Sequence, residues 1–463
     1  MGTARSGRAA AKTRRRAQAR AGPAPLPRRE FARALRLGLG RARIDVRRHG
    51  LAGREDLLLA VCVRNPTRDP QVEEGLADWL LAIAREGGAT AAVRRVVLAA
   101  ASQPIVRRND RQQIASILSR WAHEGDALAA RALLRMVDVQ VPCDHLAGSA
   151  LWGLGESAWR RVIRSYGSRW DQARRIDWSW IVYCARAAVG ARRTLAVLSA
   201  ETEGRDHLQP LAELVTSKAR ADARRDRPER EVDTSLDGLE RLVSRRSRDA
   251  YFELRRWTRR ADEAARAEAW RRLLAETDAT RIRRRLQAWC WRTPPSMHAR
   301  LLEFVRHPDR LLRVNAAGVL GRLEDGRIRS LALRMLREDP VRALDSGVLR
   351  LLERNARDED AALVDATLPK RASREMRDDW VHGVLDVVEP RRSAVWTPLL
   401  LRAMDVTPCR FCRSTVFRLL VERGAATDAM LREALLDAEE DTRRTARAAL
   451  AARRGRRRAS AGE

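Results

Sequence analysis

The residues best suited to chemistry are two cysteines near the C-terminal end of the chain, Cys409 and Cys412. They follow Thr407 and Pro408, and threonine is a good helix N-cap while proline suits the first helical position. We therefore expect Thr407 to cap a helix that places both thiols on one face of its first turn. A helix N-terminus lowers the pKa of a thiol, which would favour a reversible disulfide or half of a metal site.

Core packing is the interpretation that we favour for this pair. Cysteine behaves as a small apolar residue in protein interiors, and the strand–helix–strand setting of a thioredoxin-type motif is missing. A zinc site would need two more ligands, and the sequence contains no second Cys-x-x-Cys. We therefore predict no metal and no cofactor, with Cys409 and Cys412 as a weak dithiol candidate.

Tryptophan is the main aromatic residue, with 13 copies against five phenylalanines and three tyrosines. Five tryptophans lie among arginines between residues 152 and 180, and four more lie between residues 257 and 291. They suit either stacking platforms for nucleic-acid bases beside a cationic groove or the ordinary core role that phenylalanine fills elsewhere. We favour the core role, because aromatic residues this sparse are usually buried.

A third group of candidates is basic. The candidate polyanion-binding residues are Arg14, Arg15, Arg16, Arg255, Arg256, Arg281, Arg284 and Arg285. On a helix, Arg281 shares a face with Arg284 and Arg285, so the three could follow a phosphate backbone. The alternative is that they pair with acidic residues of the fold.

The net charge of +31, from 92 basic and 61 acidic residues, is concentrated in three segments. Residues 1–48 carry +13, residues 214–300 carry +9 and residues 453–463 carry +4, whereas residues 49–213 and 301–452 are nearly neutral. Such segments attract nucleic acid, anionic lipid or an acidic protein.

Signatures of an enzyme are missing from the sequence. It has no glycine-rich phosphate loop, no H-E-x-x-H and no G-x-S-x-G, and its seven histidines are scattered singly. We therefore predict no catalysis. No apolar run reaches the 18 residues of a membrane span, and six unevenly spaced cysteines do not form a disulfide framework, so we expect a cytoplasmic protein.

The elements that position these residues should all be helices. Apolar residues recur three or four apart, as in 75–84 and 111–118, and Gly, Pro, Asp and Asn interrupt the pattern frequently. Helix formers dominate and aromatic residues make up only 5% of the chain. We expect roughly 20 helices between about residues 30 and 452, assuming one short helix and turn per 20 residues.

A recurring motif places an Asp before an Arg one turn later, followed by small residues, at a spacing near 30. Its members are Asp309 with Arg313, Asp339 with Arg342 and Asp441 with Arg444, and Asp278 begins another copy. The motif resembles the HEAT repeat over residues 270–355 and 430–452. This resemblance implies an all-α, right-handed solenoid of stacked helical hairpins (HEAT/armadillo-like), in which the Asp caps the second helix and the Arg pairs nearby. Residues 407–424 resemble the last repeats of bacterial HEAT-like proteins, which implies a capping repeat at this end.

The composition divides the chain into five parts. Residues 1–29 should form a disordered Arg-rich arm and 453–463 a basic tail. Residues 30–215 and 236–452 should form two solenoid blocks, separated at 216–235 by a charged linker or exposed helix.

These features together favour a non-catalytic scaffold that binds another protein along its solenoid surface, with basic arms that add affinity for polyanions. The alternative is a nucleic-acid-binding protein that uses the arms and residues 214–300. A less favoured form of this alternative, suggested by the HEAT resemblance, is a DNA glycosylase.

Overall fold

Helix is the only regular secondary structure in the described residues of the computed structural model, which are 24–66, 76–225, 233–245, 248–290 and 292–461. This part of the chain forms 27 α-helices and four short 3-10 helices, which confirms the all-α prediction. The expected number of about 20 helices is too low, because several helices are very short. For example, α19 (Ala299–Phe304) and α22 (Pro340–Asp345) have six residues each.

The chain divides into two compact units. Unit 1 comprises residues 1–219 and 432–446, and unit 2 comprises residues 220–431 and 447–463. The division falls inside helix α14 (Gln209–Arg225), within the predicted charged segment.

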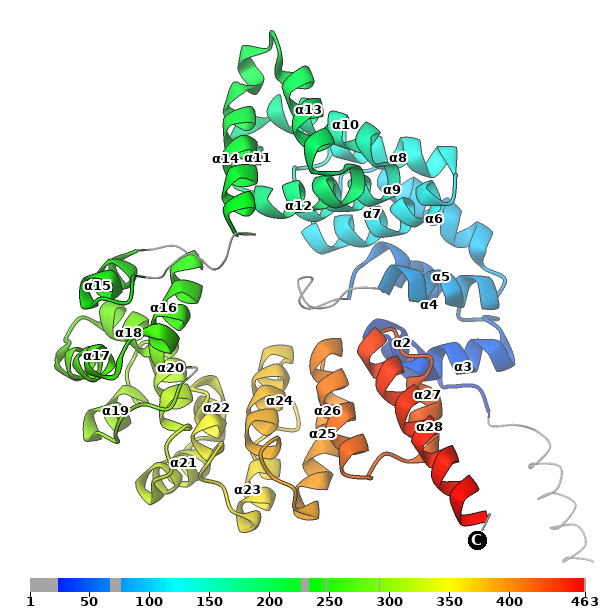
Figure 1. Cartoon of the computed structure of the whole chain (residues 1–463). Coiled ribbons are helices and arrows are strands. Elements are labelled where there is room, and N and C mark those ends of the chain that lie inside the picture. The colour runs from blue at the N-terminus through cyan, green and yellow to red at the C-terminus, as the bar shows by residue number, and fades with distance from the viewer. Residues whose placement is uncertain (1–23, 67–75, 226–232, 246–247, 291, 462–463) are drawn as a thin grey trace, which may run out of the picture. The chain divides into compact units, whose positions relative to one another are not determined.

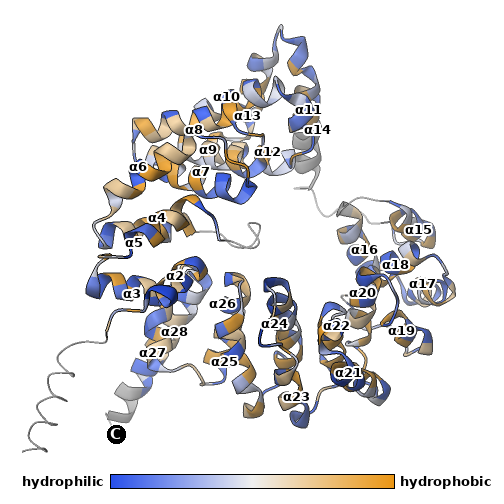
Figure 2. Ribbon diagram, turned by 180° about the vertical axis from the view of Figure 1, so that it is seen from behind, coloured by the Kyte–Doolittle hydropathy of each residue, from blue (hydrophilic) through white to orange (hydrophobic). Residues whose placement is uncertain are grey.

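Unit 1 holds the first helices of the chain. They are α2 (Arg28–Leu37), α3 (Gly40–His49), α4 (Glu55–Val63), α5 (Leu76–Glu86), α6 (Thr90–Ala101), α7 (Arg108–His123), α8 (Ala127–Val139), α9 (Asp144–Leu154), α10 (Glu156–Gly167), α11 (Trp170–Ala173), α12 (Trp178–Val189), α13 (Ala191–Thr202) and the 3-10 helix η1 (Asp206–Leu208). Helices α5, α7, α9 and α12 pack in one layer, and α6, α8, α10 and α13 pack in a second (Figure 1). Each helix has hydrophilic and apolar residues (Figure 2), and the apolar ones form the core between the layers.

The segment 432–446 belongs to unit 1 although it is far away in sequence. The backbone N–H of Ala438 donates to the carbonyl of Gly38 at 2.8 Å, and the indole N–H of Trp79 donates to the carbonyl of Leu436 at 2.8 Å. Residue 40 is glycine at this contact, where a Cβ would lie only 1.9 Å from the carbonyl oxygen of Glu433. A side chain at position 40 would therefore push the segment away.

Unit 2 contains the remaining helices. They are α15 (Leu236–Ser244), α16 (Arg248–Arg260), α17 (Glu263–Ala275), α18 (Ala279–Trp289), α19, α20 (Arg310–Leu320), α21 (Gly326–Glu338), α22, η2 (Val348–Leu352), η3 (Asp358–Asp360), α23 (Ala361–Ala366), α24 (Arg374–Val388), η4 (Ala394–Trp396), α25 (Thr397–Val406) and α26 (Arg410–Glu422). The last two helices, α27 (Asp428–Ala434) and α28 (Glu440–Ala461), cross the division. Helices α16, α18 and α20, then η2, α24 and α26, pack one after another.

Aspartates start several helices of unit 2, as the repeat motif predicts. Asp309 accepts hydrogen bonds from the backbone N–H groups of Leu311 and Leu312 at the start of α20. Asp278 and Asp339 cap α18 and α22 in the same way. Asp441 differs from them, because it is the second residue of α28 and forms an ion pair with Arg444 at 3.1 Å.

The structure describes the C-terminal end of the chain as far as residue 461, whereas at the N-terminal end it begins at residue 24. Arg14, Arg15 and Arg16 lie outside the described residues, as does most of the predicted arm at 1–29. The predicted tail at 453–463 is helical as far as Ala461 because α28 continues through it, and Arg453 bonds to the carboxylate of Asp428. None of the helices in the described ranges is both long enough and apolar enough to cross a membrane.

Candidate thiol site, arginine clusters and aromatic surface

Helix α26 presents the predicted cysteine pair, but the helix starts later than expected. Its N-cap is Cys409, whose sulfur accepts the backbone N–H of Cys412 at 3.5 Å. The prediction that Thr407 caps this helix is therefore wrong. Thr407 is fully buried, and its hydroxyl oxygen accepts the N–H of Cys409 at 3.3 Å in a turn that precedes the helix.

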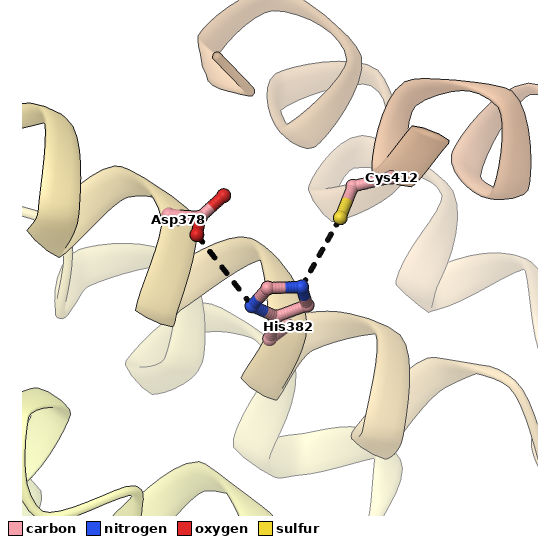
Figure 3. A group of neighbouring side chains, drawn as sticks. All are labelled: Asp378, His382 and Cys412. Carbon is pink, nitrogen blue, oxygen red and sulfur yellow. Dashed lines mark hydrogen bonds and ion pairs between the residues drawn. The ribbon is translucent and has the colours of Figure 1, made fainter. Parts of the chain in front are cut away.

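Two side chains of helix α24 complete a cluster around Cys412. The Nε2 atom of His382 lies 3.1 Å from the Sγ atom of Cys412, and its Nδ1 atom lies 3.9 Å from Oδ2 of Asp378. Figure 3 shows the imidazole between the carboxylate and the sulfur. One ligand atom from each of these three residues lies within 4.8 Å of the other two.

The cluster lies at the border between core and solvent. Cys412 and Asp378 are buried, whereas the side chain of His382 is 48% exposed. The imidazole also lines a small cavity of about 130 Å³, together with Asp379 and Arg310. Burial raises the pKa of Asp379, against the opposing effect of the Arg310 guanidinium.

The arrangement offers two kinds of chemistry. An imidazole beside a thiol can accept its proton and leave a nucleophilic thiolate, and a carboxylate behind the imidazole can orient it. The same three donor types also bind transition metals. Sequence reasoning missed His382 and Asp378 as partners of Cys412. Two spacings could have revealed them: four residues between Asp378 and His382 on one helix, and 30 residues between His382 and Cys412, which is the spacing of the repeat motif.

The thiols outside this cluster lie in protected positions. Cys62, Cys143 and Cys184 are buried. Burial raises the pKa of the Cys62 thiol to about 12 and that of Cys290 to about 11. These two therefore stay protonated and unreactive at neutral pH.

The predicted arginine ridge of α18 is engaged with carboxylates. Arg281 bonds to Glu276 and to Glu240, at 2.8 Å in each case. Arg285, whose side chain is 5% exposed, donates to both carboxylate oxygens of Glu240 at 2.8 Å. Arg284 donates to the carbonyl of Val243 at 3.4 Å.

The other pair of candidate arginines lies on α16, where Arg255 is partly buried and Arg256 is exposed. Arg256 has an exposed side chain, and the Arg281 side chain is 42% exposed although it is paired with carboxylates.

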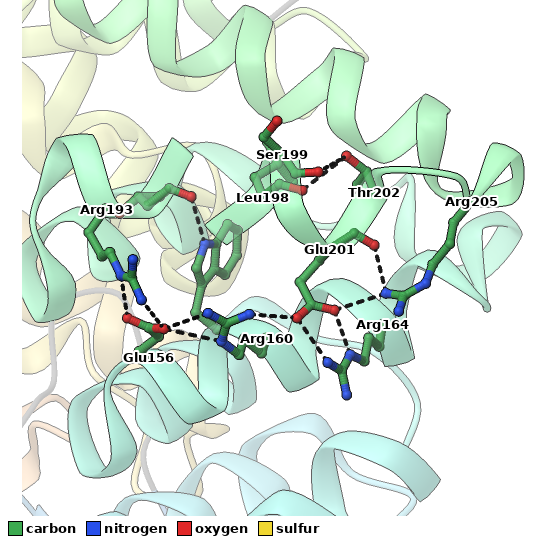
Figure 4. Close-up of polar contacts among 11 residues, drawn as sticks. Glu156, Arg160, Arg164, Arg193, Leu198, Ser199, Glu201, Thr202 and Arg205 are labelled. Carbon is green, nitrogen blue, oxygen red and sulfur yellow. Dashed lines mark hydrogen bonds and ion pairs between the residues drawn. The ribbon is translucent and has the colours of Figure 1, made fainter. Parts of the chain in front are cut away.

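Arginines that lie among the tryptophans of residues 152–180 also pair with carboxylates, in a network between α10 and α13 (Figure 4). The buried carboxylate of Glu201 accepts hydrogen bonds from Arg160 at 2.8 Å, Arg164 at 2.6 Å and Arg205 at 2.9 Å. Glu156 accepts further bonds from Arg160 and from Arg193. The arginines lower the pKa of both carboxyls to about 2, chiefly through Arg164 for Glu201 and Arg193 for Glu156.

Most tryptophans that the structure describes are core residues, as predicted. The buried ones are Trp79, Trp121, Trp159, Trp178, Trp257, Trp270, Trp289, Trp380 and Trp396. In contrast, Trp152 of α9 is 65% exposed and Trp180 of α12 is 36% exposed.

These two exposed tryptophans lie with Tyr183 on neighbouring helices. The rings of Trp180 and Tyr183 stack with their centroids 5.5 Å apart, and Tyr183 is 58% exposed. Trp180 lies over Gly148 of α9, where a Cβ would be 3.1 Å from the indole nitrogen. Trp152 follows Gly148 by one helical turn on the same face of α9. We call Trp152, Trp180 and Tyr183 the aromatic patch.

A cavity of about 780 Å³ lies in unit 2 and begins at the N-terminus of α21. Its basic lining residues are Arg306, Arg327, Arg329, Arg334 and Arg357, and its acidic ones are Glu303 and Asp325. Two of the five guanidinium groups are engaged nearby, since Arg327 pairs with Asp325 and Arg329 pairs with Asp360. The lining therefore carries an excess of positive charge.

No family model, no curated protein and no solved structure matches the sequence. A function for this chain therefore has to follow from its own residues and their geometry.

Proposed function

We propose that the chain is a non-catalytic scaffold of stacked helical hairpins that binds another protein. The observation that carries the proposal is the aromatic patch of unit 1. Removal of large aromatic side chains from water lowers the free energy of the system. Their exposure on a helical face therefore indicates a surface that a partner covers. Trp and Tyr are also the residues that most often dominate the affinity of protein interfaces.

The position of the patch supports this role. Trp159 and Trp178 are buried in the core between the same helical layers. The core of unit 1 therefore already contains large aromatic side chains and does not need those of the aromatic patch. Trp180 and Tyr183 hold each other by stacking, and Trp180 is seated on Gly148. A surface that is ordered before binding loses less conformational entropy when a partner arrives.

The stacked arrangement within unit 2 is supported by the sequence separation of its contacts. Thr258 donates to the carbonyl of Ala288, 30 residues later, and Asn355 accepts the N–H of Asp325, 30 residues earlier. Residues one repeat apart are neighbours when hairpins stack in register. Stacked hairpins expose long helical faces, which suit an extended segment of a partner.

Affinity capture from the native host tests the proposal. Wild-type chain should retain a protein that the double variant Trp152→Ala/Tyr183→Ala loses, while Leu195→Ala retains it. Leu195 is a matched control because it is 41% exposed on α13, in the other helical layer. Equal capture by the double variant and the wild-type chain would rule out the aromatic patch as the binding site.

The arginine-lined cavity of unit 2 favours a second candidate function, the binding of a phosphate-bearing polyanion such as a nucleic acid. Guanidinium groups pair with phosphate oxygens in two-pronged geometry, and Arg306 and Arg334 are exposed at this cavity. In a titration with a mixed oligonucleotide, Arg306→Ala/Arg334→Ala should weaken binding and lower the salt dependence. Arg337→Ala is the control, since Arg337 is exposed on the same helix α21 and is not among the residues that line the cavity. An unchanged salt dependence in the double variant would exclude this cavity as the phosphate site.

A further inference from the structure

We infer that Asp378, His382 and Cys412 form a binding site for a divalent transition metal, with zinc as the metal that best fits the donor set. Asp378 and His382 come from α24 and Cys412 comes from α26, and Figure 3 shows the three side chains next to one another. The inference concerns unit 2 and stands independently of the aromatic patch in unit 1.

The spacing of the donor atoms suits one tetrahedral ion. Two ligands of the same zinc lie roughly 3–4 Å apart, given metal–ligand bonds of about 2.0–2.3 Å. Cys412 Sγ and His382 Nε2 are already 3.1 Å apart, and all three ligand atoms lie within 4.8 Å of one another. Nδ1 of His382 faces Asp378 and Nε2 faces Cys412, so the imidazole has to turn for one of its nitrogens to share an ion with both partners.

The donor types select the class of metal. Calcium and magnesium take oxygen ligands, whereas a thiolate and an imidazole together favour zinc and chemically similar ions such as cobalt. Asp379 and Asp386 lie on the same helix and are close enough to His382 to interact electrostatically with it. These extra carboxylates raise the local negative charge and favour a cation.

Three protein ligands leave a fourth position for water or for an added ligand. His382 supplies the open side, because half of its side chain faces solvent and the cavity of about 130 Å³ begins there. Cys412 and Asp378 close the other side from within the core. Cys409 belongs to the helix cap in this arrangement, since its sulfur accepts the N–H of Cys412.

Metal content of the purified full-length protein tests the inference. The reduced protein is loaded with Zn²⁺, dialysed against metal-free buffer and analysed by mass spectrometry for zinc. Wild type should hold one zinc per chain, and Cobalt(II) in its place should show a thiolate-to-metal charge-transfer band. His382→Gln and Cys412→Ser should each lower the zinc affinity by at least about tenfold, since loss of an outer-shell partner alone has that effect.

Three controls make the result specific. Cys290→Ser should keep the zinc, because that thiol lies on α18's C-terminal end with a pKa of about 11. Cys409→Ser should also keep it, since serine is a good N-cap and preserves the helix start. Circular dichroism shows that each variant is folded. A wild-type protein without zinc, or folded His382→Gln and Cys412→Ser variants with full zinc, would overturn the inference, as would loss of zinc in folded Cys409→Ser.

Discussion

The imidazole of His382 lies 3.1 Å from the sulfur of Cys412, on two helices whose contacting residues are 30 positions apart in the sequence. The same separation relates Thr258 to Ala288. In both cases, residues 30 positions apart lie next to each other. A histidine and a cysteine that look isolated in the sequence become neighbours in this way.

The carboxylate of Glu201 should be essential for the stability of unit 1. Glu201→Gln removes the negative charge that three arginines share and leaves them in mutual repulsion, so we expect a loss of about 1–3 kcal/mol in the free energy of unfolding. Urea denaturation of the variant and the wild type measures the difference. Glu203→Gln, which changes a neighbouring exposed carboxylate, should have an effect below about 0.5 kcal/mol.

The same carboxylate predicts a pH dependence. The pKa of Glu201 falls from 4.5 to about 2 on folding, chiefly through its bond with Arg164. The stability that it contributes is therefore complete above pH 4.5 and is lost as the pH falls towards 2. The unfolding free energy of the wild type should decline over this window more steeply than that of Glu201→Gln. Parallel declines would contradict the assignment.

Arg285 should matter for folding rather than for binding polyanions. Its side chain is almost buried and donates to both carboxylate oxygens of Glu240. Arg285→Ala should lower the unfolding free energy by about 1–3 kcal/mol and leave oligonucleotide affinity unchanged. The control Arg256→Ala removes an exposed guanidinium and should change stability by less than about 0.5 kcal/mol. A selective loss of oligonucleotide binding in Arg285→Ala would favour the phosphate-binding interpretation instead.

The helix cap at Asp309 gives a prediction with a control inside the repeat motif. Asp309→Ala removes the acceptor for two backbone N–H groups of α20 and should cost about 1 kcal/mol. Asp441→Ala should cost less than half as much, because Asp441 follows the start of α28 and pairs with Arg444 on the surface. Chemical denaturation of both variants measures the two values, and equal losses would contradict the difference in capping.

Local chemistry explains what could be predicted from the sequence. Asp278, Asp309 and Asp339 start helices because a short carboxylate side chain satisfies the free N–H groups of a first turn, whatever the rest of the chain does. Apolar residues likewise recur three or four positions apart because each helix buries one of its faces. Thr407 misled the prediction because its hydroxyl serves the N–H of Cys409 in a buried turn.

The other features depend on which surfaces meet. The apolar positions of 432–446 predict a helical segment, but nothing in them selects the N-terminal helices of unit 1 as the surface that they cover. The partners of Arg281 and Arg285 also depend on packing, since Glu240 lies more than 40 residues earlier in the chain. For Trp152 and Trp180, the sequence pattern did not separate surface from core.

Site-specific photo-crosslinking tests the central claim, protein binding at the aromatic patch, most directly. A photoreactive phenylalanine analogue is placed at position 152, at position 183 or at the control position 195, and the native host cells are irradiated. We predict that positions 152 and 183 crosslink to the same protein and that position 195 does not. Absence of a protein adduct at both patch positions, or adducts with nucleic acid alone, would contradict the account.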